Sequence, residues 1–337
     1  MNARIPLVLS LALASCVARS DAAPALELPV FTGMCDASAA IALGPRTFAV
    51  ANDEDNVIRA YDAERPGAPI REVDLSDALG LPVRTKKNKK HSERKPAPEI
   101  DLEAATRVGD LALWISSHGR SDKGKPKPER LMLFVTTAPA DGALEVVGAP
   151  YTRLIDDLAG DPRYAGFGLR EAAERAPKEA GGLNIEGMAA RREGGVYIGF
   201  RGPVTRGKAL IATLLNPEEV VRGGAARFDA PIALDLGGLG VRELTARRDR
   251  YLLIAGDQGS ERVGQVYAWD GASGLSKLRA DDLAALNPEG VFSHEGRADV
   301  LLLSDDGTET VGGVACKKLK DGSQKRFRGM WLTADRL

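Results

Sequence analysis

Short apolar runs, separated by turn residues, repeat along most of the chain. Five of these runs end in polar residues: TFAVAND from Thr47, LALWISSH from Leu111, GVYIGFR from Gly195, YLLIAGD from Tyr251 and VLLLSDD from Val300. An acid followed by small or apolar residues precedes each run, another apolar run follows it, and most units add a fourth. Four short strands per unit, repeated with glycine-rich turns, are typical of a β-propeller blade.

The repeat predicts an all-β chain that forms a single β-propeller over 25–337, most simply with five blades of four strands. The fifth unit has no clear fourth strand after RGMWLT (Arg328 to Thr333), whereas ALELPVF (Ala25 to Phe31) precedes the first unit without a blade of its own. We therefore expect the N-terminal strand to complete the last blade and close the ring. A sixth blade within the insertions is the alternative.

Two segments interrupt the strand pattern. Helical periodicity near 155–182, strongest in LREAAERAPKEAGG from Leu169, predicts a helical insertion that Pro177 kinks and that two glycines, Gly181 and Gly182, end. The segment 84–98, which begins RTKKNKKHSERK, is strongly basic and predicts a solvated loop between the first two units.

The N-terminus has the pattern of an export signal over residues 1–22. Arg4 precedes a largely apolar stretch, Ile5 to Ala14, which is too short to span a bilayer. Leu13-Ala14-Ser15-Cys16 is also similar to a bacterial lipobox, in which cleavage leaves Cys16 as a lipid-bearing first residue; cleavage after Ala22 is the alternative. We expect a periplasmic protein or an outer-membrane-anchored lipoprotein whose only membrane contact is a lipid anchor.

The cysteine count agrees with export. Without Cys16, Cys35 and Cys316 remain, and an even number in an oxidising compartment suggests a disulfide. The predicted ring closure places the last unit beside the first, which brings these two cysteines within reach of each other. Two unpaired buried thiols are the alternative.

The repeated acids predict a functional site. In a propeller the first strand of each blade lines the central channel, and its start lies on the same face as the loop between the second and third strands. The acids that open the units would therefore encircle one mouth of the channel: Asp36, Glu103, Glu186, Glu243 and Glu289. The polar ends of the second strands would surround them as ligand-binding candidates: Asn52, Asp53, His118, Arg201, Asp257, Gln258, Asp305 and Asp306.

Carboxylates that converge on a narrow opening repel each other, so they need a cation, hydrogen-bond donors or raised pKa values. Ca²⁺, or Mg²⁺ as the second choice, suits oxygen ligands, whereas Zn²⁺ would favour His and Cys, and the chain has only 3 His. Alternatively, the acids accept hydrogen bonds from backbone N–H groups of the next blade and have a structural role.

Basic segments are predicted at the same mouth: 84–95, 118–130 and 201–208. A basic rim over an acidic centre would attract a small anionic molecule. Arg201 ends a strong strand directly before Gly202-Pro203, and a guanidinium held there would clamp an anion in bidentate fashion. The formal net charge of −1 gives no reason to expect nucleic acid as a partner, and the oligomeric state stays open.

A family resemblance is carried by NIEGMAARREGGVYIGFRGPVTRGKALIATLL (Asn184 to Leu215) and by DEDNVIRAYD (Asp53 to Asp62). The chain resembles the bacterial domain-of-unknown-function family numbered thirty-six-sixteen, similar in turn to phytase-like esterase propellers, over roughly Met34 to Leu332. The resemblance implies an exported propeller and supplies no agreed catalytic residue. A weaker similarity of pattern links the acids to calcium-activated nucleotidases, whose metal lies in the channel. Glycine follows Glu186 and Glu289, whereas LEAAT (around Glu103) and RELTA (around Glu243) depart from this E-G pattern.

Two hypotheses follow. In the first, the protein is a metal-dependent hydrolase of a small phosphoester or other anionic ester, with Glu186 and Glu289 as metal or general-base candidates and Arg201 as the oxyanion clamp. In the second, a non-catalytic envelope lipoprotein binds a ligand or a protein partner through the same face, and the ring acids are structural. Whether the protein is an enzyme stays open.

Overall fold

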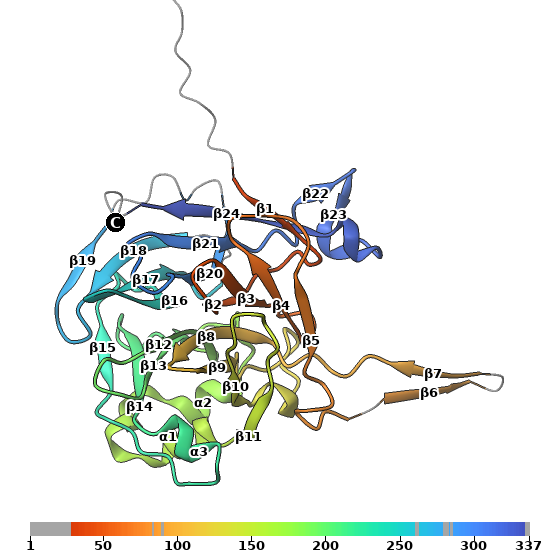
Figure 1. Cartoon of the computed structure of the whole chain (residues 1–337). Helices are drawn as coiled ribbons and strands as arrows, with labels where there is room; N and C mark the ends of the chain where they lie inside the picture. The colour runs from red at the N-terminus through yellow and green to blue at the C-terminus, as the bar shows by residue number, and fades with distance from the viewer. Residues whose placement is uncertain are drawn as a thin grey trace, which may run out of the picture.

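Five four-stranded antiparallel sheets form a ring in the computed structural model, which describes residues 28–82, 84–88, 91–259, 263–278, 283 and 286–333 (Figure 1). Blade 1 contains β2 (Ala39–Ala42), β3 (Thr47–Ala51), β4 (Val57–Asp62) and β5 (Arg71–Asp74). Blade 2 contains β8 (Leu102–Val108), β9 (Leu111–Ser116), β10 (Leu133–Thr137) and β11 (Val146–Tyr151). Blade 3 contains β12 (Asn184–Ala190), β13 (Val196–Gly202), β14 (Ala209–Leu214) and β15 (Ile232–Leu234).

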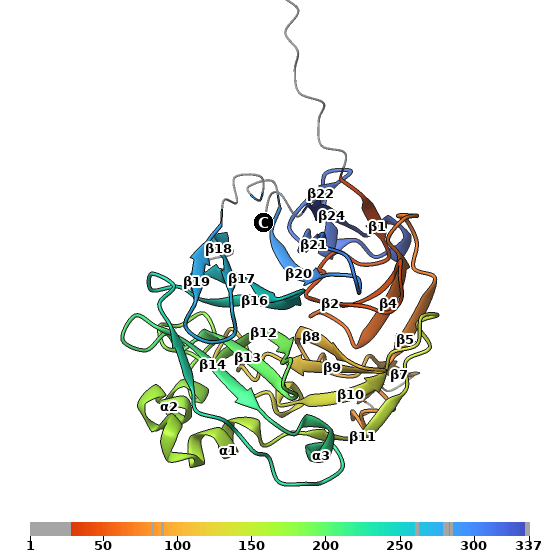
Figure 2. The same cartoon turned by 60° about the vertical axis from the view of Figure 1, so that its left-hand side comes forward.

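Blade 4 contains β16 (Gly240–Arg247), β17 (Arg250–Gly256), β18 (Val263–Trp269) and β19 (Leu275–Lys277). Blade 5 contains β20 (Pro288–Phe292), β21 (Val300–Ser304), β24 (Arg326–Leu332) and the N-terminal β1 (Val30–Thr32). The first strands of the blades, β2, β8, β12, β16 and β20, contact one another around the centre of the ring (Figure 2). The prediction of a five-bladed propeller is confirmed.

The N-terminal strand closes the ring, as the sequence predicts. β1 pairs antiparallel with β24, with Phe31 opposite Phe327. The side chains of Phe31 and Phe327 belong to a buried cluster at the junction of blades 5 and 1. In this cluster Phe31 stacks on Phe327 and meets Phe48 and Tyr61 edge-on. Burial of these rings holds the first and last parts of the chain together, because each aromatic side chain removes a large apolar area from water.

A disulfide joins Cys35 to Cys316 across the same junction, with 5.9 Å between the two Cα atoms. Cys35 lies just before β2, and Cys316 begins the short 3-10 helix η4 (Cys316–Lys318) after the small β22–β23 hairpin (Thr310–Val311 and Val314–Ala315). The bridge closes a loop with a sequence separation of 281 residues and thereby restricts the unfolded chain.

The helical insertion lies between blades 2 and 3. It consists of α1 (Leu154–Gly160), the 3-10 helix η2 (Pro162–Phe167) and α2 (Leu169–Ala173), whose apolar side chains join the core that blades 2 and 3 share. The expectation of one helix that Pro177 kinks is wrong, because α2 ends at Ala173 and turns follow. Three further short helices lie within the described ranges: η1 (Pro128–Arg130), α3 (Pro217–Val220) and η5 (Gly322–Gln324).

The basic segment between blades 1 and 2 is a hairpin rather than a loop. β6 (Arg84–Asn88) pairs with β7 (His91–Lys95) in a two-stranded sheet of its own. Figure 1 shows this hairpin projecting away from the ring. The expectation that this segment borders the channel mouth is therefore wrong for its backbone.

The predicted signal, residues 1–22 with Cys16, lies outside the described residues. In the part of the chain that the structure describes, no helix has the length and apolar character needed to cross a bilayer.

Candidate functional site

A β-bulge lies near the start of the inner strand in blades 2 to 5. The pairing with the next strand shifts between Leu102 and Ala104, between Ile185 and Gly187, between Val241 and Glu243, and between Pro288 and Gly290. One extra residue stands at each shift: Glu103, Glu186, Arg242 and Glu289. A bulge changes the direction of the side chain at the irregularity, so the same backbone device positions all four residues.

Glu243 does not occupy the position predicted for it. In blade 4 the bulge residue is Arg242, and Glu243 follows it by one residue. Successive strand residues face opposite sides, so a shift of one residue moves the side chain away from the ring of bulge residues. The buried Glu243 carboxyl accepts hydrogen bonds from the backbone N–H groups of Leu244, at 2.7 Å, and of Val291 in blade 5. Glu243 therefore joins two blades and does not line the cavity.

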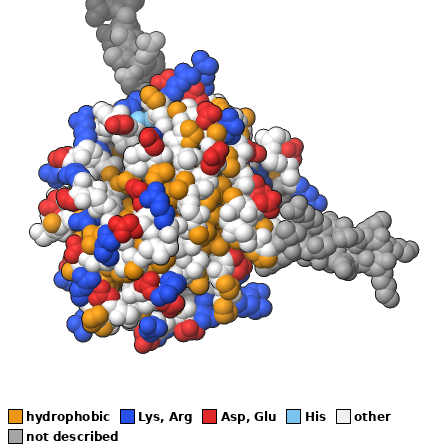
Figure 3. Space-filling model, turned by 60° about the horizontal axis from the view of Figure 1, so that its bottom comes forward, with side chains coloured by type: hydrophobic (Ala, Val, Ile, Leu, Met, Phe, Trp, Pro, Cys, Tyr) orange, Lys and Arg blue, Asp and Glu red, His pale blue; other side chains and the backbone are white. Residues whose placement is uncertain are grey.

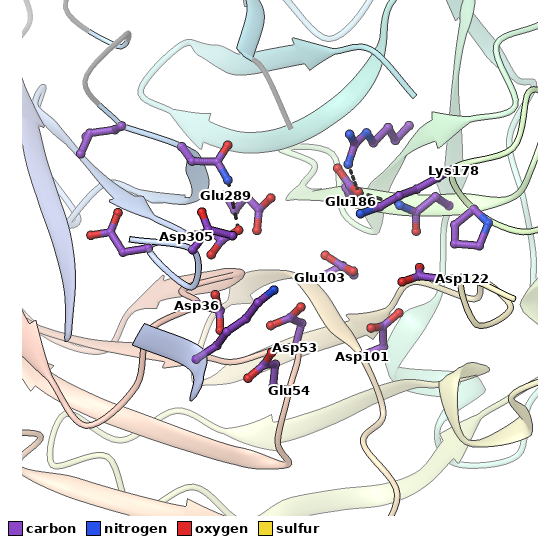
Figure 4. Close-up of a pocket in the computed structure, with 18 of the residues that line it drawn as sticks. Asp36, Asp53, Glu54, Asp101, Glu103, Asp122, Lys178, Glu186, Glu289 and Asp305 are labelled. Carbon is purple, nitrogen blue, oxygen red and sulfur yellow. Dashed lines mark hydrogen bonds and ion pairs between the residues drawn. The ribbon is translucent and has the colours of Figure 1, made fainter. Parts of the chain in front are cut away.

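A cavity of about 1720 Å³ opens at this end of the channel. Its lining includes acids from blades 1, 2, 3 and 5, and Figure 4 shows the carboxyls of Asp36, Asp53, Glu103 and Glu186 facing the same space. Five lysines also line it: Lys123, Lys127, Lys178, Lys277 and Lys317. On the face of the molecule turned forward in Figure 3, by contrast, acidic and basic side chains are interspersed.

Two of the bulge acids are neutralised by buried arginines. Arg201 Nη1 lies 2.7 Å from Glu186 Oε1, and Arg242 Nη2 pairs with Glu289 Oε1. Arg201 also donates from Nε and Nη2 to the backbone carbonyl of Asp257 in blade 4, at 3.1 and 2.9 Å. The forked edge of its guanidinium is thus already engaged, which corrects the expectation that Arg201 clamps an anion in bidentate fashion.

Four other cavity-lining acids that are not exposed form no ion pair with Lys or Arg within the described ranges. We call Asp36, Asp53, Glu103 and Asp305 the unpaired acids; they come from blades 1, 2 and 5 and line the cavity. Glu103 accepts no hydrogen bond in this part of the chain, whereas Asp305 accepts from Asn287 Nδ2 at 3.1 Å and from the Gly307 N–H at 2.8 Å. The mouth therefore has a neutralised half, in which Glu186 and Glu289 are paired with arginines, and an acidic half, which the unpaired acids form.

Burial makes ionisation of Asp36, Asp53 and Glu103 unfavourable. Burial, a hydrogen bond to the Asp305 carboxyl and nearby acidic charges together raise the pKa of Asp36 to about 10. Burial likewise raises the pKa of Asp53 to about 8, with the nearby charges of Asp101 and Asp305 acting in the same direction. The pKa of Glu103 is raised well above its usual value by burial and by Asp101 and Glu186.

Two carboxyl oxygens of the unpaired acids are buried without a hydrogen-bond partner, namely Asp36 Oδ2 and Asp53 Oδ1. Asp36 precedes β2 and forms an isolated bridge with Asp305 of blade 5. Glu289, although paired, also has a pKa raised to about 8, because burial outweighs the attraction of Arg242. At neutral pH the acidic half therefore holds protons on several carboxyls.

The predicted ligand-binding residues divide into two groups. Asp53, Arg201, Asp305 and Asp306 line the cavity, and Asp306 forms an ion pair with Arg328 at 2.7 Å. The other four do not line it: Asn52, His118, Asp257 and Gln258.

Local contacts explain the second group. The Asn52 amide accepts from the Glu54 N–H at 2.9 Å, within a turn. The His118 ring is buried against the Ser116 carbonyl, and burial lowers its pKa to about 4. Asp257 is exposed, and Gln258 Nε2 donates to the Gly182 carbonyl at 2.6 Å, which fastens the end of the helical insertion.

Sequence reasoning missed the residue two positions before each bulge acid. Asn184 Nδ2 donates to Glu186 Oε1 at 2.6 Å, and Asn287 Oδ1 accepts from Arg242 Nη2 at 3.0 Å. Asp101 occupies the same position before Glu103 and pairs with Arg130 at 2.8 Å. The recurrence of N-x-E-G at Asn184 and Asn287 was the available signal. Arg242 was missed because an alignment on acids assigns its place to Glu243.

The donor chemistry of the acidic half fits Ca²⁺. Carboxylate and carbonyl oxygens are the ligands that hard cations take, and Ca²⁺ tolerates irregular geometry better than Mg²⁺ does. A compact metal centre is nevertheless not preformed: within the described residues, no group of three or more His, Cys, Asp or Glu residues is arranged to hold an ion. The unpaired acids would have to move together to hold one.

The fold and site define a five-bladed β-propeller with an acidic cavity at one mouth of its channel. The family model described as protein of unknown function (DUF3616) matches residues 141–299, which confirms the family predicted from the sequence over that part of the chain. No curated protein matches the chain.

Solved structures provide further similarities. The crystal structure of Myxococcus xanthus glutaminyl cyclase is 10% identical, with a TM-score of 0.45 over 91% of this chain and 94% of that chain. The PQQ-bound aldose sugar dehydrogenase from Streptomyces coelicolor is 13% identical, with a TM-score of 0.39 over 91% of this chain and 99% of that chain.

Proposed function

We propose that the channel mouth binds a divalent cation, with Ca²⁺ as the best-suited ion, and that the cation helps to hold a small anionic ligand in the cavity. The observation that carries this proposal is the convergence of the four unpaired acids on one cavity, with Asp36 Oδ2 and Asp53 Oδ1 buried and without partners. Buried carboxyls that lack cations and donors are unfavourable unless something neutralises them.

Protons and a metal ion compete for these carboxyls. Without the ion, the raised pKa values of Asp36 and Asp53 keep protons on them at pH 7. A divalent cation would displace the protons and supply the charge that the four side chains lack. The three bulge acids predicted as metal ligands would then contribute unequally: Glu103 would bind the ion, whereas Glu186 and Glu289 remain paired with arginines.

The anionic ligand is supported by the lysines of the cavity wall. Lys123, Lys178, Lys277 and Lys317 line the same space as the acids. Together with a bound dication they would attract a small anion and orient it toward the acidic half. A cavity of about 1720 Å³ has room for such a molecule beside the ion.

Hydrolysis of a phosphoester or other anionic ester is a second candidate function. The observation that favours it is that Asp53 and Glu289 both have a pKa of about 8. A carboxyl group that titrates near neutral pH is suited to general acid and base catalysis. Metal-dependent release of phosphate from a panel of esters would support this activity. A protein that binds the ion and releases nothing would instead be a non-catalytic binder, anchored to the envelope if Cys16 carries a lipid.

Thermal melting with and without Ca²⁺ tests the cation site. An ion at about 100 times its Kd stabilises the folded state by about 2.7 kcal/mol, which for a chain of this size raises Tm by roughly 5 °C. The doubly substituted Asp53→Asn, Glu103→Gln protein should lose most of this rise. Glu193→Gln is the matched control, because Glu193 is exposed on the β12–β13 hairpin at the far end of β12 from Glu186. Equal Ca²⁺-induced shifts in all three proteins, or no shift in the wild type, would contradict the proposal.

A further inference from the structure

Blade 3 presents two buried oxygen acceptors that have no hydrogen-bond partner. Asn184 Oδ1 and Glu186 Oε2 are both unsatisfied, although the two residues are only 9% and 6% exposed. Both residues line the cavity, on the neutralised half of the mouth. Buried polar atoms are nearly always satisfied in folded proteins, so two such atoms side by side on one strand indicate a ligand that donates hydrogen bonds.

The two side chains are held in place by their other atoms. Asn184 Nδ2 donates to Glu186 Oε1 at 2.6 Å, and Arg201 Nη1 donates to the same oxygen at 2.7 Å. The β-bulge at Glu186 fixes the backbone beneath them. Each residue therefore keeps one bare oxygen in a defined position, which is the preorganisation that a binding subsite needs.

We infer that this pair of oxygens binds the hydroxyl groups of a polyol or sugar. Arg201 already balances the charge of Glu186. An ammonium group bound here would therefore be repelled by the nearby guanidinium and would find no carboxylate whose charge is still unbalanced. Hydroxyl groups donate hydrogen bonds without carrying charge. Two neighbouring hydroxyls match two neighbouring acceptors.

The affinity of this subsite is weak by itself. None of the cavity-lining residues in the described part of the chain is aromatic, so the sugar ring gains no stacking surface and depends on hydrogen bonds. We expect a Kd on the order of millimolar for a simple polyol. The subsite needs no cation, so it goes beyond the proposed function and can be tested independently of it.

Titration calorimetry with sorbitol and with methyl α-D-glucopyranoside, in the presence of EDTA, tests the inference. The wild type should bind at least one of them. Asn184→Leu should weaken binding about tenfold, which corresponds to about 1.4 kcal/mol for one lost hydrogen bond. Asn216→Leu is the matched control, because Asn216 is a buried asparagine beside α3 that does not line this cavity.

The inference would be overturned if the wild type bound no polyol, or if Asn184→Leu bound polyols as well as the wild type does. A parallel titration with the diamine 1,4-diaminobutane tests for an ammonium ligand instead. Loss of diamine binding in Asn184→Leu, without any effect on polyol binding, would also overturn the inference. If Asn184→Leu does not fold, Asn184→Ser replaces it and should still weaken binding several-fold. Failure here while the Ca²⁺-induced rise in Tm persists would refute the polyol subsite alone. Polyol binding without any effect of Ca²⁺ would refute the proposed function alone.

Discussion

Replacing Asp53 with asparagine should stabilise the folded protein at neutral pH and leave its stability almost unchanged in acid. Burial and the charges of Asp101, Asp305 and Glu54 raise the pKa of Asp53 to about 8, from 3.8. Between these two pH values the folded state holds a proton that the unfolded chain releases. The free energy of unfolding therefore falls as pH rises through this range. Asparagine resembles the protonated carboxyl in shape and never has to hold that proton.

The size of the effect follows from the pKa. One proton corresponds to about 1.4 kcal/mol per pH unit, and pH 7 lies about 3 units above the usual pKa of Asp53. The variant should therefore gain on the order of 4 kcal/mol at pH 7 as an upper limit, because rearrangement around Asp53 lowers the cost that the wild type bears. The new amide can also donate to the neighbouring carboxyls, whereas Asp53 Oδ1 has no partner in the wild type.

Urea denaturation, followed by tryptophan fluorescence in EDTA with the disulfide intact, measures this difference. Trp114 and Trp269 are fully buried, so they report the loss of the core. Asp53→Asn should unfold at a higher urea concentration than the wild type at pH 7.5, and by a much smaller margin at pH 4.5, which lies just above the usual pKa of 3.8. Glu193→Gln should match the wild type at both pH values. An advantage of equal size at both pH values, or none at either, would refute the reasoning about the buried proton.

Two further predictions concern the contacts that hold the ring together. Replacing both Cys35 and Cys316 with serine should lower the free energy of unfolding by about 5 kcal/mol in the chain-entropy model, seen as a lower urea midpoint; an unchanged midpoint would contradict a stabilising bridge. Arg242→Met leaves Glu289 buried without its cation, so it should destabilise the protein by about 3–5 kcal/mol and raise the pKa of Glu289 above about 8. Adding Glu289→Leu should restore most of the loss in the same assay, and no recovery would show that the pair has another role.

The architecture could be read from the sequence because its determinants are local and repeated. Turn residues separate runs such as those at Thr47 and Val300, and each run became the second strand of a blade. The missing fourth strand after Thr333 and the surplus strand before Met34 predicted the closure through β1. The hairpin at 84–95 was not predicted, because an unbroken basic run has the composition of a solvated loop and gives no sign of strand pairing.

The site could be predicted only in part, because its side-chain directions depend on backbone irregularities and on neighbouring blades. A bulge adds one residue to a strand and leaves no mark in the hydrophobic pattern. The sequence therefore predicted Glu243 at the position in blade 4 that Arg242 occupies in the structure. The orientation of Arg201 is decided by the carbonyl of Asp257, which lies in the next blade. Repetition predicted that acids would converge, but not which of them would lack a partner.

Calorimetric titration with Ca²⁺ at pH 7, in two buffers that differ in ionisation enthalpy, tests the central claim most directly. The claim is that Asp36 and Asp53 hold protons until a divalent cation replaces them. It predicts that binding one ion releases roughly one to two protons and that affinity increases from pH 6 to pH 8, because the proton on Asp53 becomes easier to remove. Absence of binding, or binding with no proton release and no dependence on pH, would contradict the claim.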